Sequence, residues 1–416
     1  MARADRPALS VEAVWRIESA RIVGALARYT GDFALAEDVA QEALAEALVA
    51  WPRDGVPENP GGWLLTTGRR RAIDAFRRRT ALDERYALLA PTMPATTEPD
   101  WDPDRVDDDI LALMFVACHP VLAREAQVAL TLRTVGGLTS EEIARAFLVP
   151  VPTVQARITR AKKTIAAAGV RFELPAADDR RQRLAGVLTV LYVIFTEGST
   201  ATAGDDLLRV DLAYEAVRLG RMLVALLPGE PEAHGLLALC ELTAARFPAR
   251  TSPDGEPVLL EDQDRRRWDR SAIRRGRAAL DRAAAVGRGL GPYGLQAAIA
   301  ACHAAAPSVA ETDWDRIVLL YEALGRVAPS PVVELNRAVA VAMAHGPGPA
   351  LALVDELVAT DRLAGSHLLP TVRGELLTRL GRTAEARAEL ELAARLCRNA
   401  RERSVLLSKA AALSGE

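Results

Sequence analysis

Long segments built from alanine, leucine and arginine constrain the fold of this chain more than any other feature. These residue types are strong helix formers, and β-branched runs that alternate every two residues are scarce. Half of the 416 residues are hydrophobic, although aromatic residues make up only 5%. A chain of this length can form two to four domains, each with its own core. We therefore predict an all-α protein.

Charge divides the chain along its length. Residues 81–109 hold nine acids and two bases, a net charge of −7, and they include the proline- and threonine-rich sequence PTMPATTEPDWDPD. This composition is typical of an extended or disordered segment. We therefore predict an acidic flexible linker at 81–107, which separates a helical domain at 10–80 from a second helical domain at 108–169.

The rest of the chain reads as a series of helices separated by short turns such as LLPGEPEA and AHGPGP. Paired helices joined by short turns are typical of a solenoid. Gly381, Ala393 and Ala400 have the small-residue spacing of a tetratricopeptide repeat. We predict a helical, tetratricopeptide-like C-terminal extension at 176–416.

The stretch GGWLLTTGRRRAIDAFRRRT, at 61–80, concentrates six arginines and one acid, whereas the whole chain has a net charge of −3. On a helix, which advances 100° per residue, Leu65, Ala72 and Phe76 share an apolar face. A solvated helix face normally mixes both signs of charge, whereas arginine suits phosphates and base edges through its planar fork. A solvated face and a nucleic-acid contact are therefore both possible, and the sequence favours nucleic acid. The exposed face is predicted to hold Arg70, Arg71, Arg77 and Arg78 around Asp74.

A second basic element is TSEEIARAFLVPVPTVQARITRAKKTI, at 139–165. Thr139 and Glu142 form a capping box that starts a helix, the VPVP turn ends that helix, and Thr153 is predicted to begin the next one. Two short helices with a tight turn and a basic second helix are typical of a helix-turn-helix, although an ordinary helical hairpin has the same outline. Base edges are predicted to be read by Thr153, Gln155 and Arg157, and phosphates to be held by Arg160, Lys162 and Lys163.

These elements together resemble an extracytoplasmic-function (ECF) type sigma factor of bacterial RNA polymerase. AEDVAQEAL (36–44) resembles the helix that docks on the polymerase β′ clamp, and NPGGWLLTTGRRRAIDAFRRR resembles the promoter −10 helix that follows it. LTLRTVGGLTSEEIARAFLVPVPTVQARITRAKKTI resembles the domain that reads the −35 element and sits on the β flap. This sigma-like part covers roughly residues 10–168. Gly68-Arg69-Arg70 stands where the family often has Ala-Arg-Asn.

The resemblance implies a role for each site. It implies that Asp38, Gln41 and Glu42, which share one helix face, contact core RNA polymerase, although an acidic solvated face has the same pattern. It implies that the 63–78 region contacts promoter −10 DNA, where Trp63 either stacks on a flipped base or anchors the core. The acidic linker either threads a polymerase channel or is a plain spacer.

The C-terminal part resembles the subgroup of these factors that carries a tetratricopeptide-like extension. Segments of the whole chain that resemble this subgroup's recurring ones are ACHPVLAREAQVALTLR, in the 108–169 domain, and GDDLLR, LLEDQDRRRWDR, GPYGLQAAIAACHA and SPVVELNRAVAVA in the extension. The resemblance implies that this extension regulates the sigma part or binds a protein partner. A competing hypothesis is a helix-turn-helix regulator with a repeat-type sensing domain, which acts without docking on polymerase.

Other features argue against enzymes, metal proteins and membrane proteins. The four cysteines are widely spread without a CxxC pair, which predicts buried thiols, no metal and no cofactor. The mixed charges of LEDQDRRRWD (260–269) lack a catalytic pattern and favour a salt-bridged loop. The apolar run LAGVLTVLYVIF (184–195) is too short to span a bilayer and is predicted to be a core helix. We expect a cytoplasmic protein that has no signal peptide and is not an enzyme.

Overall fold

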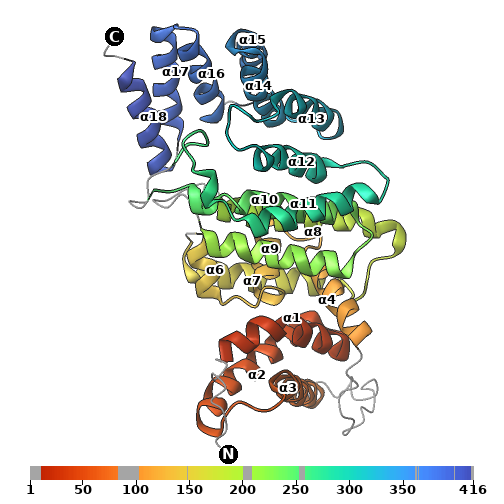
Figure 1. The fold of residues 1–416 in the computed structure, drawn as a ribbon. Helices are drawn as coiled ribbons and strands as arrows, with labels where there is room; N and C mark the ends of the chain where they lie inside the picture. The colour runs from red at the N-terminus through yellow and green to blue at the C-terminus, as the bar shows by residue number, and fades with distance from the viewer. Residues whose placement is uncertain are drawn as a thin grey trace, which may run out of the picture. The chain divides into compact units, whose positions relative to one another are not determined.

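The computed structural model describes residues 11–82, 103–147, 149–199, 209–252, 258–360, 363, 365–397 and 399–413. Within these ranges every regular element is an α-helix or a short 3-10 helix, which confirms the all-α prediction (Figure 1). The chain separates into two compact units, residues 1–191 and 192–416. Most of the predicted acidic linker lies outside the described residues.

The first unit holds both sigma-like sequence elements. Its helices are α1 (Val11–Thr30), α2 (Phe33–Asp54), α3 (Pro60–Leu82), α4 (Pro103–Ala117), α5 (Arg124–Thr134), α6 (Ser140–Phe147), α7 (Val151–Ala167) and the first part of α8 (Ala177–Ser199).

Helix α1 is the centre of packing for the N-terminal part of this unit, because α2, α3 and α4 all pack against it. Val23 and Leu26 are completely buried there. Gly68 of α3 faces Leu26, and a Cβ atom at this glycine would lie only 2.7 Å from Leu26 Cδ1. A side chain at position 68 would therefore require either the Leu26 side chain or helix α3 to shift.

The second unit consists of helices that follow one another in space as they do in sequence. These are α9 (Val210–Leu226), α10 (Pro231–Ala244), α11 (Arg270–Ala285), α12 (Pro292–Ala305), α13 (Trp314–Val327), α14 (Pro331–His345), α15 (Pro347–Ala359), α16 (Leu368–Arg379), α17 (Thr383–Leu396) and α18 (Ala400–Ala412), with the 3-10 turns η1 (Phe247–Ala249) and η2 (Arg265–Arg267). Each helix from α9 to α18 packs against the next one along the chain.

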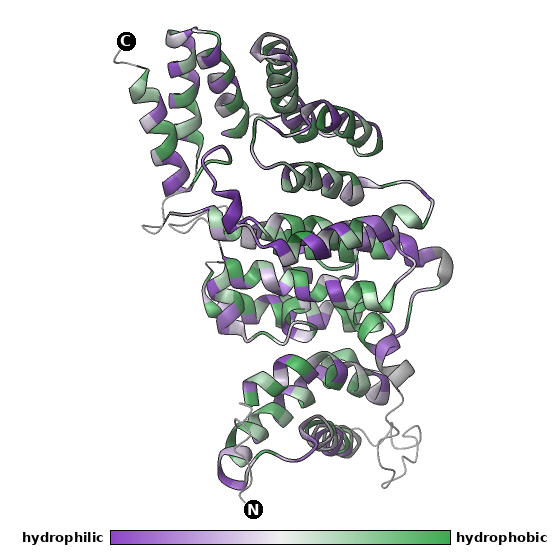
Figure 2. Ribbon diagram, viewed as in Figure 1, coloured by the Kyte–Doolittle hydropathy of each residue, from purple (hydrophilic) through white to green (hydrophobic). Residues whose placement is uncertain are grey.

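This neighbour-on-neighbour packing is the arrangement of a helical repeat array. Prolines occupy the first position of α10, α12, α14 and α15, where the missing N–H costs no hydrogen bond. Figure 2 shows hydrophilic and hydrophobic residues along the same helices, as expected for amphipathic helices that bury one face. The tetratricopeptide subtype remains a prediction.

The charged stretch 260–269 forms caps and a local ion pair. Asp264 accepts a hydrogen bond from the Arg266 backbone N–H and lies 2.9 Å from the Arg266 guanidinium. Asp269 is the N-cap of α11 and accepts from Ser271 and Ala272 N–H at 2.7 and 3.1 Å. The prediction of a salt-bridged loop is therefore confirmed for Asp264 and Arg266, whereas Asp269 acts as a helix cap.

The apolar run 184–195 lies within α8, and its most apolar side chains, including Leu188, Ile194 and Phe195, are buried. No helix in the described ranges combines the length and hydropathy that crossing a bilayer requires. All four cysteines are free thiols. Cys118, Cys240 and Cys397 are buried as predicted, whereas Cys302 is only half-buried.

Candidate nucleic-acid and polymerase interface

Helix α3 carries the arginine-rich face, and its start is fixed by local chemistry. Pro60 occupies its first position, and the Asn59 side chain accepts a hydrogen bond from Gly62 N–H at 2.9 Å. Leu64, Leu65 and Ala72 are buried at no more than 3% exposure. The helix is therefore held by its apolar stripe, and the arginines are left on the other side.

The four predicted contact arginines and Asp74 are all exposed, in line with the helical-wheel expectation. Arg78 Nε donates to the backbone carbonyl of Asp74 at 3.3 Å. By contrast, the Arg69 guanidinium lies over the Tyr29 ring, 5.3 Å from its centroid. Arg69 thus packs onto α1, away from the exposed arginine face.

Arg71 has partners that the helical wheel did not include. Its Nη2 atom lies 2.7 Å from Glu46 Oε2 and its Nε atom 3.9 Å from Glu42 Oε2, both on α2. The hydrogen bond to Glu46, with the charge of that carboxylate, raises the pKa of Arg71 above its ordinary value. Glu42, a predicted polymerase contact, and Arg71, a predicted DNA contact, are therefore neighbours.

Trp63 stands against a second tryptophan. Its ring meets Trp51 edge-on, with centroids 5.5 Å apart and planes at 70°. Trp51 is only 4% exposed, whereas Trp63 is half-buried. Part of the Trp63 ring is thus used in packing and part of its surface remains accessible.

The helix-turn-helix sequence forms α6 and α7. The predicted capping box is present, because Glu142 accepts from Thr139 N–H at 2.8 Å and Thr139 Oγ1 accepts from Glu142 N–H at 3.1 Å. Helix α7 begins at Val151, two residues before the predicted start, because Pro152 is tolerated in a first helical turn. The buried face of α7 is the one predicted, with Val154, Ile158, Ala161 and Ile165.

The predicted DNA-contact residues of α7 do not share one environment. Gln155, Arg160 and Lys163 are exposed, and Thr153 and Arg157 are half-buried. Arg160 Nε donates to the Ala156 carbonyl at 3.2 Å. Lys162 differs from all of these, because its side chain is only 14% exposed.

Lys162 is held by the acidic face of α2. Its Nζ atom lies 2.7 Å from Glu37 Oε2 and also contacts the Asp38 carboxylate. Burial lowers the pKa of Lys162, but the charges and hydrogen bonds of the two carboxylates outweigh this effect and raise it overall. Lys162 is therefore a charged, partly buried link between α7 and α2.

Arg133 of α5 makes a second link to the same helix. Its Nη2 donates to Gln41 Oε1 at 2.6 Å, its Nε to Glu37 Oε1 at 3.4 Å and its Nη1 to the Leu138 carbonyl at 3.1 Å. Glu37 is only 3% exposed. This buried carboxylate therefore has two cationic partners, Lys162 and Arg133. In this structure, two of the three predicted polymerase contacts, Asp38 and Gln41, are bound by residues of the helix-turn-helix half.

Sequence reasoning did not single out Glu37, Glu46 or Arg133. Each has its partner on another helix, and the partners of Glu37 lie about a hundred residues or more away in the chain. Glu37 carried one usable signal: it adjoins Asp38 within the AEDVAQEAL motif. A helical wheel does distinguish Lys162 from Lys163: Lys162 falls about 80° from Val154, at the edge of the buried stripe, and Lys163 falls about 180° away.

Comparison with known proteins agrees with this arrangement of elements. Residues 16–81 match Sigma-70 region 2, residues 112–165 match Sigma-70 region 4, and residues 183–284 match a family of unknown function, DUF6596. The chain is 46% identical over 397 residues to the uncharacterized protein R00370 of Rhizobium meliloti (strain 1021), covering 91% of this chain and 90% of that protein. No solved structure matches. The chain therefore belongs to the same family as R00370 and is an ECF-like sigma factor, in which sigma-70 regions 2 and 4 are followed by a C-terminal DUF6596 extension.

Proposed function

We propose that this protein binds core RNA polymerase and directs initiation at a specific class of promoters. The acidic face of α2, with Asp38, Gln41 and Glu42, contacts the β′ clamp, and the helix-turn-helix half sits on the β flap. Helix α3 contacts the −10 element, and α7 reads the −35 element. The protein acts in the cytoplasm and is not itself an enzyme.

The observation that carries this proposal is the pairing of two separate basic surfaces with the two sigma-70 regions. Helix α3 exposes Arg70, Arg77 and Arg78 beside Asp74. None of these three arginines forms an ion pair with another described residue. Helix α7 exposes Gln155, Arg160 and Lys163. Unpaired guanidinium and ammonium groups on an exposed face suit phosphate and base contacts.

Docking in this way requires α2 and α7 to separate. Lys162 and Arg133 contact Asp38 and Gln41 in the free chain, so polymerase and promoter DNA compete with these internal contacts. We propose that the free chain is a closed form of the sigma part and that it opens on polymerase.

The extension, predicted at 176–416, is proposed to control this sigma part from within the same chain, either by holding it closed or by binding a partner that releases it. It belongs to the tetratricopeptide-like subgroup in this proposal. Support comes from its size and from the successive packing of α9 to α18, which builds the extended surfaces that repeat proteins use for partners.

Run-off transcription with core polymerase tests the proposed function. The full chain, a promoter-containing genomic library as template and core polymerase together are expected to give discrete transcripts that neither protein gives alone. A matched variant, Asp38→Ala with Glu42→Ala, is expected to lose polymerase binding while keeping its fold by circular dichroism. DNA binding without any polymerase association would overturn the proposal in favour of a regulator that acts alone.

A further inference from the structure

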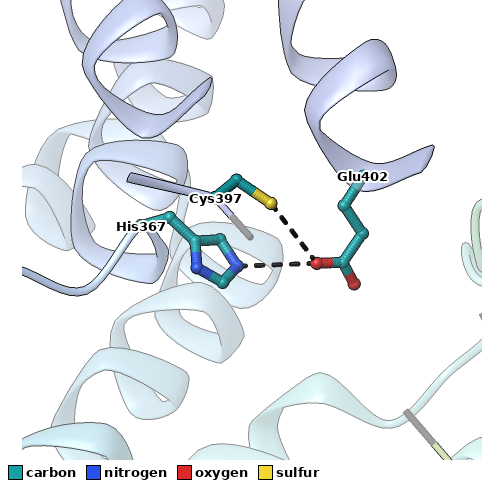
Figure 3. A group of neighbouring side chains, drawn as sticks. All are labelled: His367, Cys397 and Glu402. Atoms are coloured by element: carbon teal, nitrogen blue, oxygen red, sulfur yellow. Dashed lines mark hydrogen bonds and ion pairs between the residues drawn. The ribbon is translucent and has the colours of Figure 1, made fainter. Parts of the chain in front are cut away.

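Three side chains in the C-terminal part of the second unit form a cluster that the proposed function does not use. Figure 3 shows His367, Cys397 and Glu402 pointing toward one another. His367 immediately precedes α16, Cys397 immediately follows α17, and Glu402 lies in the first turn of α18. The cluster therefore gathers residues from three consecutive helices that pack together.

We propose that His367, Cys397 and Glu402 form a binding site for a borderline-soft divalent cation, with Zn²⁺ as its natural occupant. Thiolate, imidazole and carboxylate are all zinc ligands, and a thiol with an imidazole selects against Mg²⁺ and Ca²⁺. No other group of three such side chains comes this close within the described part of the chain.

The separations of the ligand atoms suit this ion. His367 Nε2 lies 3.6 Å from Glu402 Oε2, Cys397 Sγ lies 3.8 Å from the same oxygen, and all three ligand atoms lie within 4.8 Å of one another. Ordinary zinc bond lengths at tetrahedral angles place nitrogen and oxygen about 3.4 Å apart, and sulfur and oxygen about 3.6 Å apart. The two separations from the Glu402 oxygen exceed these values by only a few tenths of an ångström. The His367 nitrogen and the Cys397 sulfur, which lie within 4.8 Å of each other, would also have to move closer together around a metal ion.

Local contacts hold two of these ligands, Glu402 and Cys397, in defined positions. The buried Asn399 caps α18 by accepting from Arg401 and Glu402 N–H at 3.0 and 3.1 Å, which fixes the first turn that carries Glu402. Cys397 is buried, so its thiol position is set by core packing with Leu390 and Leu406. These contacts position the ligands in the way that supporting residues do in known metal sites.

Exposure and charge indicate an open site rather than a closed structural one. The side chains of His367 and Glu402 are 30% and 32% exposed, so an ion can enter and a water can fill the fourth coordination position. Arg250 is close enough to Glu402, and Arg403 to Cys397, for their charges to interact. These positive charges weaken the attraction for a cation, so we expect reversible binding. Binding displaces the Cys397 thiol proton to solvent as the sulfur–metal bond forms.

This inference departs from the expectation drawn from cysteine spacing, which predicted no metal. His367 and Cys397 are 30 residues apart in the sequence, so the ligands do not form a short sequence motif. It does not depend on the transcriptional role proposed above. Its consequence for the extension is that metal binding ties the last three helices together.

Metal titration of the reduced, full-length chain is the direct test. One equivalent of Zn²⁺ per chain is expected to bind, and Co²⁺ used in its place is expected to give a thiolate-to-cobalt charge-transfer band. Cys397→Ser should abolish that band, and His367→Ala and Glu402→Gln should each weaken binding roughly tenfold or more. Cys302→Ser and His345→Ala, which alter a thiol and an imidazole elsewhere in the second unit, serve as controls and should bind like the parent chain.

A second measurement avoids any question of whether a variant folds. Alkylation of Cys397 in the unaltered chain, followed peptide by peptide with mass spectrometry, is expected to slow when Zn²⁺ is added. Cys302 in the same sample provides the reference rate. An unchanged Cys397 rate with saturating Zn²⁺, or a charge-transfer band that persists in Cys397→Ser, would overturn the proposal.

Discussion

Lys162 and Lys163 are neighbours in the sequence and differ in what surrounds them. Lys162 is held by two carboxylates of α2, whereas Lys163 is exposed and has no ion pair among the described residues. Counting basic residues on a predicted recognition helix therefore overstates the charge that is available to DNA. At the residue scale, the useful quantity is the set of cations that have no internal partner.

Arg157 and Lys163 are predicted to make different contributions to DNA binding. Arg157→Ala is expected to weaken binding to −35 DNA by about 1–3 kcal/mol relative to scrambled DNA, because a base-edge contact is lost. Lys163→Ala is expected to weaken binding to both DNAs alike and to lower the salt dependence by about one counterion. Band-shift titrations on both DNAs at several salt concentrations measure these effects. Equal losses on the two DNAs for Arg157→Ala would reject its reading role.

Arg71 is predicted to gain DNA contact when its partner on α2 is neutralised. Glu46→Gln removes the carboxylate that lies 2.7 Å from Arg71 and leaves only the 3.9 Å contact with Glu42, so the guanidinium becomes more available to a phosphate. Binding to single-stranded −10 DNA is expected to tighten, with a salt dependence steeper by up to about one counterion. The fold should be unaffected, because surface ion pairs contribute little to stability.

Fluorescence anisotropy with a labelled −10 oligonucleotide, repeated at several salt concentrations, measures this change. Glu12→Gln, an exposed acid on α1, is the matched control for the change in net charge. If both substitutions tighten binding equally, Arg71 is not the cause.

At the scale of elements, the contact of α2 with α5 and α7 is the feature with the most consequences. Glu37 receives both Lys162 and Arg133 while it is nearly inaccessible to solvent. Buried carboxylates need such partners, because an unpaired buried charge is costly. The contact of α2 with α5 and α7 therefore depends on a few charged side chains, with Glu37 at its centre.

Removing the Lys162 charge is predicted to loosen this contact. Lys162→Met keeps the apolar stem and removes the ammonium, and it is expected to lower the free energy of unfolding by about 1–3 kcal/mol. Because the pKa of Lys162 is raised, its contribution is complete below the ordinary value of 10.5 and is lost only as pH rises through the raised value.

Urea unfolding at neutral pH and hydrogen exchange of α2 and α7 measure this effect. Lys163→Met is the matched control and should leave both measurements unchanged. Unaltered exchange in α2 for Lys162→Met would mean that the ion pairs do not hold the two helices together.

The sequence predicted the elements whose determinants are local. The capping box, the buried stripe of α7 and the exposed arginines of α3 follow from residues within a few turns of one another. The sequence could not predict the α2–α7 contact or the Arg71–Glu46 pair, because these join residues on different helices without any periodic signal. The start of α7 was misplaced by two residues because prolines were treated as ending one helix rather than opening the next.

On the scale of the whole molecule, α8 belongs to both compact units. In the first unit, Arg183 donates to the Phe115 carbonyl at 3.0 Å and lies over the Phe115 ring. In the second unit, Phe195 stacks on Phe247 at 6.4 Å and Tyr192 lies 5.4 Å from Tyr293. The sequence predicted a domain boundary before α8. A chain cut at that boundary therefore loses the contacts that α8 makes with the first unit.

Two truncations are predicted to separate regulation by the extension from support by α8. A chain ending at Gly169 loses the Arg183 contacts and is expected to be less stable than a chain ending at Ser199. If the extension controls the sigma part, both truncated chains should differ from the full chain in transcription with core polymerase. Thermal unfolding and run-off transcription of the three chains measure these two effects separately. Transcription by the Ser199 chain that equals that of the full chain would contradict control by the extension.

The ion pairs of Glu37 with its two cationic partners also affect how much free polymerase is needed to bind half of this protein. For a sigma factor that docks through α2, only the opened fraction of molecules can bind, so the apparent dissociation constant rises by the inverse of that fraction. Each ~1.4 kcal/mol held in the closed contact raises tenfold the amount of free polymerase needed for half-occupancy. The same few side chains would then fix how abundant this factor must be before it can compete with other sigma factors for the enzyme.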